Sequence, residues 1–223
     1  MRRGDCSTIP SAIVGGWPEV RIACVWLPRL PLRVEVLRQP AWDGRPLVLG
    51  GAPGGRQVVQ LCSPEAELAG LRPGLPLREV VARCPEAIVV RPDPVRVGEI
   101  LEQVLAALQR VSPSVELAEE RLLLDLGGLR ALYGGDLRRL ERAIWAAVPP
   151  LLRPRVGIAH GKLTAEIAAR AAPPGGLKVV PRAATVRFLA PLPVGELPFT
   201  PEQLRQLKLL GLRTVAELTQ LPF

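Results

Sequence analysis

The chain has 223 residues, of which 48% are hydrophobic and 22% charged, the balance of a folded globular protein rather than a disordered or fibrous one. No apolar run in the sequence approaches the roughly 20 residues that a membrane-spanning helix needs, so we predict no such helix and no membrane partner. The net charge of +8 favours polyanionic ligands without specifying one.

The cysteines and the histidine argue against a metal centre. The four cysteines, Cys6, Cys24, Cys62 and Cys84, lie far apart and form no CxxC pair. This spacing is typical of buried free thiols in a reducing cytoplasm, not of zinc ligands or a disulfide framework. The one histidine, His160, has no His or Cys close by in the sequence. We therefore predict a cytoplasmic protein without a metal site.

Apolar runs and breakers predict alternating strands and helices along the chain. Residues 1–20, interrupted by Gly15-Gly16 and Pro18, are interpreted as a flexible tail. Short apolar or β-branched runs predict strands at 22–27, 46–50, 58–62, 88–90, 155–159 and 177–181, and a hairpin of 115–117 with 121–126. Helical spacing and caps predict helices at 32–37, 64–69, 77–83, 95–110, 137–148, 163–171 and 183–189, with two short helices in 192–223.

The stretch 21–51 resembles the N-terminal motif of Y-family (translesion) DNA polymerases. Val34-Glu35, Pro40, Gly44 and Pro46-Leu47-Val48 fit this motif without a gap. In the family, the first strand carries a metal-binding Asp and is followed by an aromatic gate. The resemblance places Trp26 at the position of that Asp and Pro31 at the gate.

The block 63–85 resembles the fingers segment of the same family, with Ala66, Gly70 and Pro76 matching. In active members, a Tyr and an Arg of this segment hold the triphosphate of the nucleotide. Those two positions are Pro64 and Glu67 here. A carboxylate repels a phosphate unless a metal ion intervenes, so the resemblance implies that nucleotide binding is lost at this point.

Counting back from Leu124-Asp125, the second catalytic pair of the family, Asp-Glu, falls on Glu120 and Arg121, or one position away because the hairpin is shorter. Two-metal transfer needs carboxylates that bridge ions about 3.5–4 Å apart, and neither Trp26 nor Arg121 supplies one. A solvated turn is the favoured interpretation of this hairpin tip. We therefore expect no cofactor, with Mg²⁺ required only if the chain is an enzyme with atypical ligands.

The segment 157–176 also resembles the family, with Lys162 and Ile167-Ala168-Ala169 matching, but the second Lys of its motif is Glu166 here. The stretch 192–223 resembles the DNA-binding helix-hairpin-helix of the thumb, although Pro198-Phe199-Thr200-Pro201 departs from the family's glycine-rich turn. The resemblance makes basic residues of these two segments the candidate DNA contacts: Lys162, Arg205, Lys208 and Arg213.

The resemblance implies an α+β fold: a ferredoxin-like βαββαβ palm, a small fingers insertion and a helical thumb with a degenerate helix-hairpin-helix. We assign the palm to 21–31 and 88–175, the fingers to 32–87 and the thumb to 176–223. The little finger, which follows the thumb in the family, is expected to be absent.

The joint loss of functional residues resembles the ImuB-type branch, whose members are catalytically inactive. It implies a non-catalytic scaffold in DNA damage tolerance that links the sliding clamp, a recombinase-like accessory protein and an error-prone replicative-type polymerase, with DNA as a further ligand. Two alternatives stay open. One is an active DNA-directed nucleotidyltransferase with atypical metal ligands, and the other is a protein–protein module without DNA contact.

Overall fold

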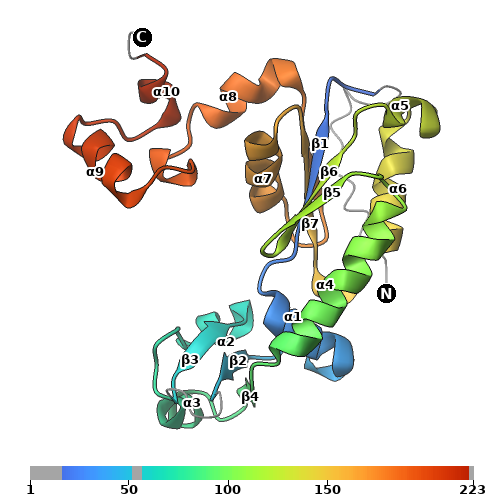
Figure 1. Cartoon of the computed structure of the whole chain (residues 1–223). Coiled ribbons are helices and arrows are strands. Elements are labelled where there is room, and N and C mark those ends of the chain that lie inside the picture. Colours follow the sequence, from blue (N-terminus) through green and yellow to red (C-terminus); the bar gives the residue numbers. More distant parts are fainter. Residues whose placement is uncertain (1–16, 52–56, 221–223) are drawn as a thin grey trace. The chain divides into compact units, whose positions relative to one another are not determined.

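A computed structural model describes residues 17–51 and 57–220 of the chain (Figure 1). Most of the expected tail, residues 1–16, lies outside these ranges. Contacts divide the chain into two compact units. The first contains the described residues up to Trp26, Ser112–Arg142 and those from Arg155 onward, and the second contains Leu27–Val111 and Ala143–Pro154.

The first unit is built on a five-stranded sheet of order β5-β6-β1-β7-β8. β1 is antiparallel to both β6 and β7, whereas β7 and β8 are parallel. Its strands are β1 (Ile22–Trp26), β5 (Val115–Ala118), β6 (Arg121–Asp125), β7 (Arg155–Ala159) and β8 (Leu177–Val180). With α4 (Pro94–Gln109) and α6 (Leu137–Ala147) as connections, the chain follows the βαββαβ order with β1 between the third and fourth strands. The predicted ferredoxin-like α+β fold is confirmed.

Helix α7 (Lys162–Ala171) packs on one face of this sheet, against β1, β7 and β8. Side chains alternate along a strand, so Cys24 and Leu123 point toward α7 and join the buried cluster that contains Ala165 and Ala168. Gly157 lies directly under the helix, because a Cβ built there would collide with the backbone of Ala165 and Ala169. The contact is therefore apolar and as close as backbone atoms allow.

The remaining helices of the first unit are short. They are α5 (Leu129–Leu132), η4 (Arg182–Ala184), α8 (Thr185–Leu189), η5 (Val194–Glu196), α9 (Pro201–Leu209) and α10 (Val215–Leu218). α9 and α10 each begin with a capping box, formed by Thr200 with Gln203 and by Thr214 with Glu217. These caps explain why the two helices predicted in 192–223 form, although most of their residues are exposed.

The second unit has a three-stranded sheet of order β3-β2-β4, with β2 antiparallel to β3 and parallel to β4. Its strands are β2 (Leu47–Gly50), β3 (Val59–Cys62) and β4 (Ile88–Val90). Its shorter helices are α1 (Leu30–Arg38), η2 (Pro40–Trp42), α2 (Pro64–Leu68), α3 (Leu77–Arg83) and η3 (Pro150–Leu152). One apolar cluster joins Val48 to Ala66 and Val80, and another joins Leu47 to Leu32 and Val36.

Helix α1 begins earlier than predicted, at Leu30 instead of residue 32. Pro31 falls in its first turn, where the missing N–H group would have no partner in any case. Arg29, with φ 57°, makes the sharp change of direction that precedes the helix. The predicted start is two residues late, because a proline that ends a strand can also stand in the first turn of the following helix.

The described cysteines are the buried free thiols that the sequence predicts. Cys24 lies in the first unit, and Cys62 and Cys84 lie in the second. Burial raises the pKa of the Cys24 thiol to about 12. None of the helices in the described ranges has the length and apolar character needed to cross a membrane.

Candidate functional site

Trp26 lies at the end of β1, directly between two arginines of the neighbouring strands. The strand register pairs Trp26 with Arg121 of β6 and with Arg155 of β7. The guanidinium carbon of Arg155 lies 5.4 Å from the centre of the Trp26 ring, a cation–π distance. The position that the resemblance equates with a metal-binding Asp is thus occupied by an aromatic ring beside a fixed positive charge.

Arg121 is neutralised by a carboxylate of α7. Its Nη1 donates to Glu166 Oε2 at 2.6 Å, and the two side chains are only 23% and 20% exposed. A second carboxylate, that of Glu119, lies 3.4 Å from Arg121 Nη2 but is almost fully exposed. The two residues that the resemblance places at an acid and a lysine of active relatives are thus an arginine and an acid, which bind each other.

Glu119 and Glu120 form the two-residue turn of the β5–β6 hairpin, because Ala118 pairs with Arg121. Glu119 adopts a left-handed conformation with φ 56°, which is uncommon for a residue other than glycine. Glu120, the second residue of the turn, is half-buried and directly precedes Arg121 in the sequence. The structure thus brings Trp26 and Arg121 together at one end of the sheet, and Glu120 precedes Arg121 in the hairpin turn.

In the second unit, the residues that the resemblance places at nucleotide-binding positions make contacts within the protein. Ser63 caps α2 by accepting from the backbone N–H of Ala66, and Pro64 occupies the first turn. Glu67, at the position of the family's triphosphate-binding Arg, accepts from Arg29 Nη2 through both carboxylate oxygens, at 2.9 and 2.8 Å. Pro31 lies on the first turn of α1.

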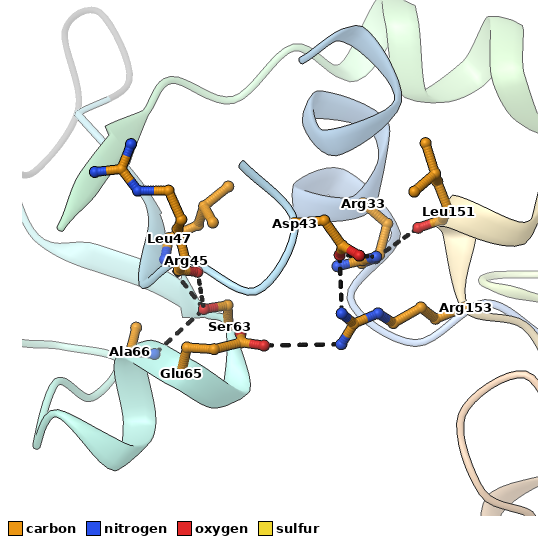
Figure 2. A network of polar contacts seen from close by, with 9 residues as sticks. All are labelled: Arg33, Asp43, Arg45, Leu47, Ser63, Glu65, Ala66, Leu151 and Arg153. Carbon is orange, nitrogen blue, oxygen red and sulfur yellow. Dashed lines mark hydrogen bonds and ion pairs between the residues drawn. The ribbon is translucent and has the colours of Figure 1, made fainter. Parts of the chain in front are cut away.

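A polar network around Asp43, which sequence reasoning missed, holds the second unit together (Figure 2). Arg33 Nη2 lies 2.7 Å from Asp43 Oδ1, and Arg153 Nη2 lies 2.9 Å from the same oxygen. Arg33 Nε also donates to the carbonyl oxygen of Leu151 at 2.8 Å, and Arg153 Nη1 lies 3.7 Å from Glu65 Oε1. One carboxylate therefore links α1 to the segment around η3.

Burial acts to raise the pKa of the Asp43 carboxyl, but hydrogen bonds from Arg33 and Arg153 outweigh it and hold the pKa below its ordinary value. A signal for this network exists in the sequence. Arg33 stands inside the run Leu32-Arg33-Val34-Glu35-Val36, all of which is buried in the structure. A charged residue at a buried helical position requires a partner.

The predicted DNA-binding residues lie on two elements of the first unit. Lys162 begins α7 and forms an ion pair with Glu116 of β5. Arg205 and Lys208 lie on α9, and Arg213 precedes α10. Arg205 has Glu202 3.3 Å away on the same helix, with both side chains largely exposed. The backbone N–H of Arg213 donates to the Glu217 carboxylate at 2.6 Å. Three of the four residues therefore share the α9–α10 hairpin, and three of the four have a carboxylate nearby.

The fold, with these segments in this order, matches part of the fold of Y-family DNA polymerases. The model of the IMS (impB/mucB/samB) family matches residues 25–170, and the chain belongs to this family, whose members are Y-family polymerases and their homologues. "DNA polymerase IV" of Dehalococcoides mccartyi is 31% identical over 91% of this chain and 53% of its own length. "DNA polymerase IV" of Alkalilimnicola ehrlichii is 33% identical over 84% of this chain and 54% of its own length.

Solved structures support the same fold. DinB from Sulfolobus solfataricus matches with a TM-score of 0.72 at 22% identity, over 91% of this chain and 60% of its own. A post-insertion binary complex of Dbh DNA polymerase matches with a TM-score of 0.75, also at 22% identity, over 91% of this chain and 61% of its own. The chain spans about half the length of the curated relatives that it matches.

The expectation of no cofactor is wrong in the light of these relatives. They are named DNA polymerases, and polymerases transfer nucleotides with two metal ions, which makes Mg²⁺ the cofactor that the family implies. The residues at the matching positions do not fit it, because Trp26 and Arg121 offer no oxygen ligand. Among the described residues, there is also no group of three or more His, Cys, Asp and Glu side chains arranged to hold a metal.

Proposed function

We propose that this chain is the polymerase-like part of a non-catalytic Y-family homologue of the ImuB type, which acts as a scaffold in DNA damage tolerance. The observation that carries the proposal is the ion pair between Arg121 and Glu166, at 2.6 Å. Its arginine stands where two-metal transfer needs an acid, and its acid stands where active relatives use a lysine toward the triphosphate. Each charge cancels the other instead of holding metal or phosphate.

Two further substitutions support the proposal because they are also built into the fold. Trp26 stacks against Arg155, and Glu67 is held by Arg29. A scaffold keeps the apolar frame of a polymerase while its functional positions take on contacts within the protein. The retained frame here includes the Gly157 contact under α7 and the buried strands.

Primer extension tests the proposal directly. The whole protein as expressed from its gene is incubated with Mg²⁺, the four deoxynucleotides and a primed template, beside a DNA polymerase IV as a positive control. We expect no template-dependent extension, because Trp26 and Arg121 offer a metal ion no oxygen ligand and the charge of Arg121 is already paired with Glu166. Template-dependent extension that Glu120→Ala abolishes would overturn the scaffold in favour of the second candidate.

The second candidate is an active DNA-directed nucleotidyltransferase with atypical metal ligands. The names of the relatives favour it, as does Glu120, a half-buried acidic residue that directly precedes Arg121. It predicts Mg²⁺-dependent extension that disappears when chelator is added. It also predicts that restoring the acid with Arg121→Glu raises the rate.

The partners, the domain limits and the location belong to the same proposal. We place the protein in the cytoplasm, bound to the sliding clamp, a recombinase-like accessory protein and an error-prone replicative-type polymerase. We assign the palm to 21–31 and 88–175, the fingers to 32–87 and the thumb to 176–223. Co-purification of the full protein with clamp and polymerase tests the partner set, and the absence of both from the purified complex would contradict it.

DNA contact is proposed through Lys162, Arg205, Lys208 and Arg213. The exposure of the three hairpin residues supports it, whereas the ion pair of Lys162 with Glu116 reduces what that lysine offers. Affinity for primed DNA measured against salt concentration tests the contact, because each neutralised phosphate adds about 0.9 to the slope. A flat salt dependence would favour a protein–protein module instead.

A further inference from the structure

We infer that a second surface of the first unit, formed by Arg130, Arg138, Arg139 and Arg142, binds the phosphate backbone of nucleic acid. We call these four residues the arginine patch. All four are exposed, on α5 and on the first turns of α6. Figure 1 shows α5 and the start of α6 on one side of the five-stranded sheet and α7 on the other. The patch is therefore separate from the Arg121–Glu166 pair.

The four arginines form one continuous surface around the turn Gly134-Gly135. A Cβ built on Gly134 would lie 3.1 Å from Arg139 Nη1, and one built on Gly135 would lie 4.0 Å from Arg130 Nε. Both glycines have positive φ, at 62° and 69°, and so reverse the chain between α5 and α6. Arg142 Nε reaches the backbone carbonyl of Arg138 at 3.3 Å, which joins the fourth residue to the rest.

The positive charge of the patch is not neutralised by the part of the protein that the structure describes. None of its four guanidinium groups forms an ion pair with a carboxylate of the described residues. The two acids of the segment 130–142 are used elsewhere. Asp136 accepts from the backbone N–H of Arg138, and Glu141 is 8% exposed.

The arrangement is not explained by the stability of α6. Arg138 and Arg139 stand in the first turn and add positive charge to the positive end of the helix dipole, which the carboxylate of Asp136, directly before the helix, offsets only in part. Arg138 and Arg142 are four residues apart, where like charges repel. An arrangement that costs the fold free energy, at an exposed surface, indicates a ligand that supplies the missing negative charge.

Phosphodiester backbone is the ligand that this chemistry fits best. Guanidinium groups bind phosphate oxygens through two parallel hydrogen bonds, and four exposed arginines together match a chain of repeated negative charges. A protein partner would need a buried apolar centre, and Leu132 is the one large exposed apolar side chain within the segment 130–142. The inference rests on one part of the proposed function, that the chain acts on DNA as a member of a polymerase family, and is independent of the proposed loss of catalysis.

The test is the salt dependence of DNA binding, measured by fluorescence anisotropy with labelled primed duplex and single-stranded oligonucleotides. The patch variant combines Arg130→Gln, Arg138→Gln, Arg139→Gln and Arg142→Gln. We expect its affinity to fall about tenfold or more, and the slope of log K against log salt to become shallower by about 3, because each lost phosphate contact removes about 0.9.

Two matched variants separate charge, geometry and location. The same four positions changed to Lys keep the charge, so the slope is expected to stay as in the wild type. A thumb variant, Arg205→Gln with Lys208→Gln and Arg213→Gln, removes the other proposed contact and is expected to leave the contribution of the patch in place. If the patch variant binds DNA as the wild type does, with or without an effect of the thumb variant, the inference is overturned.

Polyglutamate, tested by the same method, provides the remaining outcome. If the patch variant loses polyglutamate binding and keeps DNA binding, the patch is a site for an acidic protein and the inference fails.

If the patch variant does not fold, as judged by circular dichroism, the double variant Arg138→Gln with Arg142→Gln replaces it, since removing this pair relieves a like-charge repulsion. A slope shallower by about 1–2 is then expected. Primer extension tests the non-catalytic role separately from DNA binding. A chain that extends primers and also binds DNA through the arginine patch would overturn the scaffold proposal and leave the patch inference standing.

Discussion

Each of the two compact units is stabilised internally by a different kind of contact. In the first, α7 lies on the sheet through small apolar residues and through a backbone contact over Gly157. In the second, apolar clusters lie against the small sheet, but α1 is joined to the segment around η3 by the Asp43 network. The centre of the first contact is apolar, with the ion pairs of Arg121 with Glu166 and of Lys162 with Glu116 beside it. The second contact depends on shape and on the ionisation of one carboxylate.

This difference predicts different sensitivities. A close apolar contact tolerates changes of pH and salt but tolerates no added volume. A network of buried charges tolerates small changes of volume but not the loss of one member, because the remaining charges are left without partners. Four experiments follow, from the largest expected effect to the smallest.

Gly157→Ala is expected to have the largest effect. The added methyl group collides with the backbone of Ala165 and Ala169, which cannot move without lifting α7 from the sheet. We expect the free energy of unfolding to fall by about 3 kcal/mol, measured by urea titration with circular dichroism. Gly161→Ala is the matched control, because a Cβ at that position meets nothing within 4 Å. Its effect should stay at or below about 1 kcal/mol, the cost of replacing glycine by alanine at the N-cap of α7. Equal effects of the two changes would contradict the close contact.

Asp43→Ala comes second. It leaves the guanidinium groups of Arg33 and Arg153 without their shared carboxylate, and the side chain of Arg33 is only 11% exposed. We expect a loss of about 2–3 kcal/mol in the same urea titration, below the range for a fully buried pair because Asp43 is itself 31% exposed. Glu202→Ala, which breaks the exposed pair with Arg205, is the control and should change stability by less than about 1 kcal/mol.

The pH dependence of the second unit follows from the same carboxylate. The pKa of Asp43 is lower in the folded state than in the unfolded chain, where it is about 3.9. Its contribution is therefore fully present above the unfolded pKa and is lost as the pH falls through the folded one. The difference in stability between the wild type and Asp43→Asn should shrink below about pH 4. A difference that stays constant down to pH 2 would show that the charge of Asp43 does not stabilise the fold.

The smallest effect is expected at the Arg121–Glu166 pair. Arg121→Glu places a carboxylate beside two others and should cost about 1–2 kcal/mol, since the pair is one-fifth exposed. Adding Glu166→Arg restores the attraction in reverse and should recover most of the loss, as measured by a double-mutant cycle. Full additivity of the two changes would mean that the ion pair contributes nothing to the first unit.

The sequence predicts the strands of this molecule well, and the reason is local. Segments such as Ile22–Trp26 and Arg155–Ala159 are short apolar runs between breakers, so their form depends on few distant contacts. Their order in the sheet came from the family resemblance, because periodicity does not identify a strand's neighbours. β8, at the start of the segment assigned to the thumb, pairs with β7 and extends the palm sheet.

The candidate site was predictable in position but not in its contacts. The resemblance indicated that Trp26 and Arg121 belong together, and the strand register places them side by side. It did not indicate that Arg121 binds Glu166, that Arg29 binds Glu67 or that Asp43 binds two arginines. These partners lie far apart in the sequence. Because the chain contains many arginines, only the packed structure determines which of them binds a given carboxylate.

The buried thiols give each unit an internal reporter of its own opening. Cys24 lies beneath α7 in the first unit, and Cys62 and Cys84 lie inside the second. A thiol with a pKa near 12 supplies almost no reactive thiolate at neutral pH, so Cys24 becomes alkylated only after α7 leaves the sheet. Peptide mapping of alkylated cysteines over time would then distinguish separate opening of the two units from their concerted unfolding, without any engineered label.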